Sequence, residues 1–278
     1  MAKRPMTVKE LQETELEILK AFHRFCEEHH LRYYLSGGTL LGAIRHKGFI
    51  PWDDDIDLCM PRPDYMKLVE ILKDGQLDQY RYLNTRYLDK DCPSSMIRVC
   101  DNRTELDFTE YRIPYKIGCW IDVFPLDGLE DDEKKRYYHF RKMRLAIDLF
   151  ICCLSKFGQK RRSKAVTILQ YGILPFLPFI RLVGYKRYLD WIDKIARQCD
   201  YESAKYVGVV GGRAVEKEAM KKADMEPAIL VDFEGEKFYT MANYDEYLTN
   251  LYGDYMTPPP ENERVSRHII DVYWKDVK

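Results

Sequence analysis

Residues 33–65 of the chain, YYLSGGTLLGAIRHKGFIPWDDDIDLCMPRPDY, decide the fold. The stretch begins in a short, aromatic-rich segment at residues 31–36 that is typical of a strand and is followed by two glycines. The segment TLLGAIRH then predicts a short helix with Thr39 as its N-cap. A second strand, DIDLCM, follows at residues 55–60, and Pro63 opens another helix that runs to about Leu72.

The second strand carries two carboxylates with one residue between them. Side chains two apart in a strand point to the same face, so Asp55 and Asp57 should share a side with Cα atoms roughly 6.5–7 Å apart. Carboxylates this close repel each other unless a cation lies between them. Ligands that are all oxygen suit Mg²⁺ or Mn²⁺ better than zinc. Ile56 and Leu58 point the other way, into a core.

The loop of residues 36–39 (Ser36, Gly37, Gly38 and Thr39) joins the first strand to the short helix. Glycines let the backbone approach a bound group, and the N–H groups and dipole of a helix start favour phosphate. Arg45 and Lys47 follow this loop and are candidates to neutralise phosphate charge. A metal-bound phosphate needs both backbone N–H groups for the anion and carboxylates for the metal. The glycine loop followed by the strand with Asp55 and Asp57 is therefore a more specific signal than the loop or the strand alone.

A third carboxylate is expected in the strand at residues 119–124, CWIDVF. Asp122 stands there between Ile121 and Val123, and a charged group in an apolar strand needs a partner such as a metal. It is also a candidate to accept the proton of an attacking hydroxyl. The alternative is that Asp122 caps a turn before Pro125, since Pro125 and residues 127–128 are expected to end the strand.

Outside this region, local patterns predict the remaining elements. Apolar residues at helical spacing indicate an amphipathic helix from about Val8 to Glu28. Further predictions are a strand at residues 96–100, a helix at 131–150, a strand at 206–212, a hairpin with a Glu-Gly turn at 228–241, and a helix from Asp245 to Leu251 that ends at Gly253.

Residues 149–189 differ from the rest because they contain no Asp or Glu, carry basic residues and include the apolar run YGILPFLPFI. Three interpretations stay open. The segment is a basic, apolar arm on an anionic membrane, a helical subdomain with a buried apolar face, or a transmembrane helix. The last is disfavoured, since the run is short and interrupted by Pro175, Pro178 and Arg181.

Composition narrows the class of protein. With 46% hydrophobic residues, a packed core is expected. The 44 basic residues nearly cancel the 45 acidic ones, so nucleic acid is not an expected partner. The 8 cysteines form no CxxC pair and indicate reduced thiols. The charged start of the chain lacks the apolar centre of a signal peptide, and a cytoplasmic location is expected.

Other interpretations compete with the metal site. The Asp-rich turn before residue 57 is also compatible with a solvated acidic loop. It imitates the start of an EF-hand, but that loop needs Gly and Glu where Leu58 and Asp64 stand. Arg45 and Lys47 are also compatible with ordinary surface charges. Trp52 and the tyrosines are candidates for a quaternary-ammonium cage, although such residues more often belong to the core.

Residues 33–65 resemble the LicD family of phosphotransferases, which includes phosphorylcholine transferases. The segments WIDVFPLDG (residues 120–128) and YLTNLYGDYMTPPPENERVSRH (residues 247–268) are similar to later parts of that family. The resemblance spans most of the chain, and the basic segment 149–189 is its least typical part.

The resemblance implies an α/β (α+β) fold, a nucleotidyltransferase-like mixed sheet flanked by helices, related to the fukutin-type enzymes. We expect a catalytic core at residues 1–148, a basic helical insertion at 149–200 that faces membrane or acceptor, and a C-terminal part at 201–278 that completes the core. The resemblance implies that the metal ligands are Asp55, Asp57 and Asp122. It also implies that the glycine loop with Thr39, and the basic residues Arg45, Lys47 and Arg98, bind the donor phosphates. Arg264 and His268 match the C-terminal pattern of the family, and the sequence does not indicate their role.

The activity that the resemblance implies is transfer of phosphocholine from CDP-choline to a hydroxyl of a cell-surface glycan, such as lipopolysaccharide or teichoic acid, with release of CMP. Mg²⁺ or Mn²⁺ is the expected cofactor, and a lipid-linked acceptor would place the enzyme at the inner face of the plasma membrane. One alternative is a nucleotidyltransferase that attaches a nucleotide to a small molecule. Another is a non-catalytic module that binds membrane or glycan.

Overall fold

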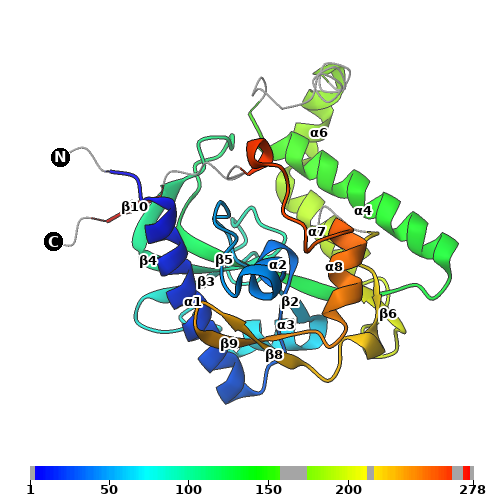
Figure 1. Cartoon of the computed structure of the whole chain (residues 1–278). Helices are drawn as coiled ribbons and strands as arrows, with labels where there is room; N and C mark the ends of the chain where they lie inside the picture. Colours follow the sequence, from blue (N-terminus) through cyan, green and yellow to red (C-terminus); the bar gives the residue numbers. More distant parts are fainter. Residues whose placement is uncertain (1–3, 157–173, 212–215, 265–271, 276–278) are drawn as a thin grey trace.

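The computed structural model describes residues 4–156, 174–211, 216–264 and 272–275, which form a mixed α/β structure (Figure 1). The described helices are α1 (Val8–His29), α2 (Gly37–His46), α3 (Arg62–Ile71), α4 (Glu133–Leu154), α6 (Leu177–Val183), α7 (Tyr185–Ala196) and α8 (Tyr244–Tyr252). The described strands are β1 (Tyr34–Leu35), β2 (Asp57–Pro61), β3 (Arg81–Asn84), β4 (Ile97–Asp107), β5 (Lys116–Leu129), β6 (Tyr206–Gly208), β7 (Met220–Lys221), β8 (Ile229–Phe233), β9 (Glu236–Thr240) and β10 (Tyr273–Trp274).

The main sheet is built around β5. Its strand order is β1-β2-β5-β4-β10, with β3 paired to β4, β6 paired to β5 and β7 paired to β6. Only the pairing of β2 with β5 is parallel among the described strands; the others are antiparallel. Strands β8 and β9 form a separate hairpin. The predicted fold class, a mixed sheet flanked by helices, is confirmed.

Helix α1 begins at Val8 as predicted and packs its apolar face on the sheet (Figure 1). Thr7 caps the helix by a capping box with Glu10, which satisfies two backbone N–H groups at the helix start. Ile18 and Phe22 are fully buried on the face that meets the sheet. The periodicity of the sequence therefore predicted both the extent and the buried side of this helix.

The start of α2 differs from the prediction. The helix begins at Gly37 with Ser36 as its N-cap residue, so Thr39 lies inside the first turn rather than at the cap. Its Oγ1 instead accepts a hydrogen bond from the backbone N–H of Asp57 at 2.8 Å. Thr39 thus ties the start of the helix to the start of β2, which begins at Asp57 and not at Asp55.

Strand β5 also runs further than predicted, through Pro125 to Leu129. Pro125 is accommodated opposite Met60 in the parallel pairing with β2, and the last residues of β5 pair with β6. Asp127 does not end the strand. Its buried carboxylate accepts hydrogen bonds from Nε and Nη2 of Arg62 at 2.6 and 2.7 Å, and this bidentate pair joins the start of α3 to β5.

Helices α4 and α7 share a second apolar core. It contains buried side chains of both helices together with Leu129 and Val210 from the sheet side. Helix α4 spans the predicted boundary between residues 148 and 149, and the predicted division into three parts stays a prediction. The second core places α4 and α7 as one layer beside the sheet (Figure 1).

Helix α6 has a different environment from its neighbours. Leu177 is buried, but Phe176, Phe179 and Leu182 are 63%, 71% and 83% exposed. Every described helix is too short or too polar to span a lipid bilayer. Part of the predicted segment 149–189 lies outside the described residues. Only α4, α6 and α7 therefore bear on its three interpretations.

Two local predictions near the C-terminal part are confirmed. Glu234 and Gly235 have φ angles of 50° and 78° and form the turn of the β8–β9 hairpin. Helix α8 ends at Gly253, whose φ of 71° suits glycine. Both signals are local, since each depends on the conformation of one or two residues.

The buried Arg62–Asp127 pair generates a stability prediction. Asp127→Ala should lower the free energy of unfolding by about 3–5 kcal/mol, because it leaves the Arg62 guanidinium buried without its carboxylate. Urea unfolding followed by circular dichroism measures this loss. The double variant Arg62→Met with Asp127→Leu should recover most of it.

The matched control is Asp232→Ala, which breaks the exposed ion pair between Asp232 and Lys237 on the hairpin. Solvent and salt screen an exposed pair, so this variant should unfold at nearly the wild-type urea concentration. Equal losses in Asp127→Ala and Asp232→Ala would contradict a special role for the buried pair.

Candidate active site

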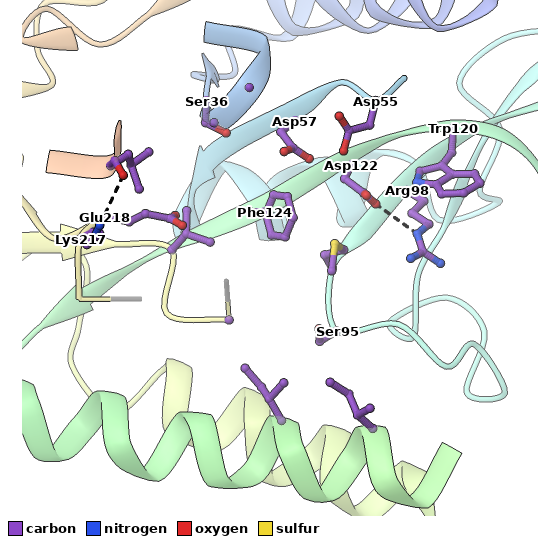
Figure 2. Close-up of a pocket in the computed structure, with 18 of the residues that line it drawn as sticks. Ser36, Asp55, Asp57, Ser95, Arg98, Trp120, Asp122, Phe124, Lys217 and Glu218 are labelled. Carbon is purple, nitrogen blue, oxygen red and sulfur yellow. Dashed lines mark hydrogen bonds and ion pairs between the residues drawn. The ribbon is translucent and has the colours of Figure 1, made fainter. Parts of the chain in front are cut away.

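A cavity of about 880 Å³ lies between the sheet and α4. Its sheet side is formed by the starts of β2 and β4, the middle of β5 and the start of α2, and its opposite wall is formed by α4 (Figure 2). The α4 wall is both apolar and basic and consists of Phe140, Arg141, Arg144, Ile147, Phe150 and Ile151. The cavity is large enough for a ligand of nucleotide size.

Three charged side chains cross the sheet side of this cavity in a row. Asp57 on β2 is the register partner of Asp122 on β5, and Asp122 is the partner of Arg98 on β4. Arg98 Nε donates to Asp122 Oδ1 at 3.1 Å. Asp55, one residue before Ile56 in the chain, joins the same cavity (Figure 2).

The alternation of β5 places two aromatic residues beside Asp122. Trp120 and Phe124 lie two residues to either side of it and line the cavity. The guanidinium of Arg98 lies 5.1 Å from the ring centre of Trp120 and 5.3 Å from that of Phe108. Arg98 is therefore held by a carboxylate and by two aromatic faces at once.

The glycine loop touches the acidic group directly. A Cβ added to Gly37 would lie 3.1 Å from Asp57 Oδ2, and one added to Gly38 would lie 2.7 Å from Asp53 Oδ2. Gly37 also has a φ of +54°, which favours glycine. The two glycines therefore let the start of α2 lie against the carboxylates, and their role as a phosphate cradle stays a prediction.

Burial and neighbouring carboxylates act together on the ionisation of Asp57. Burial first, and then Asp55 and Asp122, raise the pKa of Asp57 well above its usual range. Burial and the charge of Asp55 likewise raise the pKa of Glu15, an α1 residue that also lines the cavity. Glu15 is buried, and its Oε2 has no hydrogen-bond partner among the described residues.

A further carboxylate, Glu218, lines the cavity just before β7. Burial raises the pKa of Glu218 to about 7. Its neighbour Lys217 does not neutralise it, because Lys217 Nζ turns to the carbonyl oxygen of Leu251 at 3.5 Å. Figure 2 shows Glu218 and Arg98 on opposite sides of the aspartate group.

The residues present fit a hard divalent cation by their chemistry. Asp55, Asp57 and Asp122 supply only oxygen ligands, and a cation among them would relieve the repulsion that raises the pKa of Asp57. In the described part of the chain, no three His, Cys, Asp or Glu side chains are already arranged as a metal site. The pair of Asp122 with Arg98 occupies one oxygen that a metal would otherwise use.

The structure brings many of the predicted site residues together. The predicted residues that line the cavity are Ser36, Gly37, Gly38, Asp55, Asp57, Arg98 and Asp122. Arg45 and Lys47 do not line it. They lie at the far end of α2, about 12 Å (Arg45) and about 15 Å (Lys47) along the helix from Gly37 at 1.5 Å per residue. Arg45 donates instead to the carbonyl oxygen of Tyr255 at 2.8 Å. Their assignment to donor phosphate stays a prediction that their position does not support.

The predicted tail residues are only partly described. Arg264 donates to the carbonyl oxygen of Pro259 at 2.9 Å, and its guanidinium lies 5.5 Å from the ring centre of Trp52. Neither Trp52 nor Arg264 lines the cavity, so Trp52 is not part of an open cage there. His268 lies outside the described residues.

Sequence reasoning missed several cavity residues that carry usable signals. Glu15 stands at helical spacing within the apolar face formed by Leu11, Ile18 and Phe22, where an acid is unexpected. Trp120 and Phe124 follow from the alternation around Asp122. Glu218 carries no such local signal, because the turn before β7 brings it to the cavity.

The sequence of the chain is similar to those of known proteins. The family model described as LicD/FKTN/FKRP, nucleotidyltransferase domain, matches residues 30–142. The lipopolysaccharide cholinephosphotransferase LicD of Haemophilus influenzae is 34% identical over 274 residues, which cover 96% of this chain and 98% of the relative. The human ribitol 5-phosphate transferase FKRP is 64% identical over 28 residues, which cover 10% of this chain and 6% of the relative.

The charge of the acidic group generates a testable prediction. The pKa of Asp57 is higher in the folded state than in the unfolded state. At neutral pH the ionised carboxylate of Asp57 therefore destabilises the folded protein, and this free-energy penalty disappears as the pH falls. Without divalent cation, Asp57→Asn should therefore raise the melting temperature, by roughly 2–4 °C. Added Mg²⁺ should stabilise the wild type more than the variant.

Differential scanning fluorimetry with EDTA and with Mg²⁺ measures both effects. Asp74→Asn is the control, since Asp74 is exposed and lies outside the cavity. A lower melting temperature for Asp57→Asn in EDTA would contradict the repulsion argument.

Proposed function

Because the chain belongs to the LicD family, we propose that it is a metal-dependent phosphotransferase that moves phosphocholine from CDP-choline to a hydroxyl of a cell-surface glycan and releases CMP. The relative that matches almost the whole chain is named for choline phosphate and lipopolysaccharide. The observation that carries the proposal is the row of Asp57, Asp122 and Arg98 beside the glycine loop in one cavity.

The reaction assigns a different task to each part of the row. Asp55 and Asp57 would hold Mg²⁺ or Mn²⁺ together with Asp122, and the bound metal would supply positive charge to the phosphate oxygens. The acceptor hydroxyl forms a bond to the outer phosphorus of the donor, while the bond from that phosphorus to the CMP oxygen breaks. The hydroxyl proton passes to Asp122, which Arg98 orients through the 3.1 Å bond.

Arg98 also offers a contact to the donor. Its Nη1 is buried and makes no hydrogen bond among the described residues. A buried donor without a partner is costly, and a phosphate oxygen in the cavity would satisfy it. Its charge would then stabilise the departing CMP.

The proposal predicts the outcome of a CMP-release assay with Mg²⁺ and a panel of CDP-donors (choline, ethanolamine, ribitol and glycerol), with and without a lipopolysaccharide acceptor. CDP-choline should react best. Activity should disappear on chelation, and Asp57→Ala should retain less than about one per cent of turnover, because the phosphate charge is no longer balanced. Asp74→Ala should retain full activity.

Two other results would replace the proposal. Release of pyrophosphate from a nucleoside triphosphate, without CMP release from any CDP-donor, would favour the nucleotidyltransferase. Binding of lipopolysaccharide without turnover of any donor would favour a non-catalytic module.

We further propose that α6 holds the enzyme on an anionic membrane that carries the acceptor, at the inner face of the plasma membrane. The exposed residues Phe176, Phe179 and Leu182 form an apolar surface on or next to this helix. Described residues 174–189 contain no acidic residue and include Arg181 and Arg187, whereas Lys186 pairs with Asp91. An apolar surface with basic neighbours is the combination that anionic lipid attracts.

Sedimentation with vesicles tests this contact. The protein should bind vesicles of phosphatidylglycerol and phosphatidylcholine and bind pure phosphatidylcholine weakly. Phe179→Ser with Leu182→Ser should reduce binding by at least about tenfold, because two inserted side chains are lost. Leu230→Ser is the control, since Leu230 is 48% exposed on the separate hairpin. Indifference of the wild type to anionic vesicles would reject the membrane contact.

A further inference from the structure

The cavity has two aromatic ends of opposite charge. At one end, Trp120 and Phe108 surround the guanidinium of Arg98. At the other end, Glu218 lines the cavity, and the neighbouring helix α8, which Lys217 contacts at Leu251, contributes Tyr247 and Tyr252 to the lining. The aspartate group lies between these ends (Figure 2). A donor whose phosphates lie at the aspartates must therefore extend its two substituents toward ends of different character.

The Arg98 end is unsuited to a second cation. The aromatic faces of Trp120 and Phe108 are already occupied by a guanidinium, and a quaternary ammonium placed there would meet its positive charge. This end instead suits the anionic CMP part of the donor, since the buried Arg98 Nη1 lacks an acceptor among the described residues.

The Glu218 end has the opposite character. Its nearest lysine in sequence, Lys217, donates to the carbonyl oxygen of Leu251 and not to Glu218. Among the described residues, the Glu218 side chain makes no ion pair or hydrogen bond, and Figure 2 shows its carboxylate on the side of Phe124. A carboxylate among aromatic rings is the environment that binds a quaternary ammonium group, because both attract positive charge without requiring a hydrogen-bond donor.

Tyr247 connects this end to the glycine loop. Its hydroxyl accepts a hydrogen bond from the backbone N–H of Gly37 at 3.2 Å, so the ring is fixed beside the start of α2. Tyr247 is buried, whereas Tyr252 at the end of α8 is 46% exposed and forms the outer side. The subsite is therefore adjacent to the place where the proposed phosphates lie.

We propose that Glu218, Tyr247 and Tyr252 bind the quaternary ammonium group of the donor and select a cationic over a neutral phospho-substituent. This inference rests on the proposed function, because it assumes a CDP-linked donor at the aspartates. It also sets the direction of the donor, with the choline on the Glu218 side and CMP on the Arg98 side. A neutral polyol phosphate gains nothing from a carboxylate in this position.

The test is donor binding without acceptor, measured by isothermal titration calorimetry in the presence of Mg²⁺. The two probes are CDP-choline and CDP-3,3-dimethylbutanol, which replaces the charged nitrogen by carbon at nearly the same shape. Wild-type protein should bind CDP-choline at least about tenfold more tightly. Glu218→Gln should lose most of this preference, and Glu202→Gln, an exposed control outside the cavity, should keep it.

A second pair of variants keeps the test informative if Glu218→Gln fails to fold. Tyr252→Phe retains the ring and should keep the preference, whereas Tyr252→Leu should reduce it by about threefold. Equal binding of both probes by the wild type would overturn this inference and leave the transferase proposal intact. The same preference in Glu218→Gln as in the wild type would also overturn it. Binding of neither probe by the wild type would overturn both proposals.

Discussion

The parallel pairing of β2 with β5 is the constraint on which the site depends. Its register sets Asp57 opposite Asp122, and the antiparallel neighbour β4 adds Arg98 to the same row. A slip of one residue would turn Asp122 to the opposite face, where Ile121 and Val123 are fully buried. Because the backbone pairing fixes these positions, the carboxylates cannot separate to relieve their repulsion. The folded sheet therefore holds negative charge that a bound cation can balance.

Much of the fold was predictable because its signals are local. The amphipathic period of α1, the Glu234-Gly235 turn and the end of α8 at Gly253 each depend on residues close in sequence. The seven predicted residues that line the cavity belong to short segments in which chemistry and position agree. The metal itself, the roles of these residues and the division into domains stay predictions.

The features that escaped prediction depend on contacts distant in sequence. The sequence near Pro125 does not indicate that pairing with β2 and β6 extends β5 beyond this proline. Arg45 follows the glycine loop closely in sequence, yet the length of α2 carries it away from the cavity. Glu218 reaches the site only because β7 pairs with β6. Sequence spacing alone does not contain these distances, because they arise from how whole elements pack.

The two walls of the cavity come from separately packed layers. The aspartate row belongs to the sheet, whereas the opposite wall belongs to α4, which shares its apolar core with α7. Residues on the cavity side of α4 can therefore be substituted while the register of the sheet stays intact. This separation lets lineages diversify one wall of the cavity while they inherit the carboxylate row of the sheet unchanged.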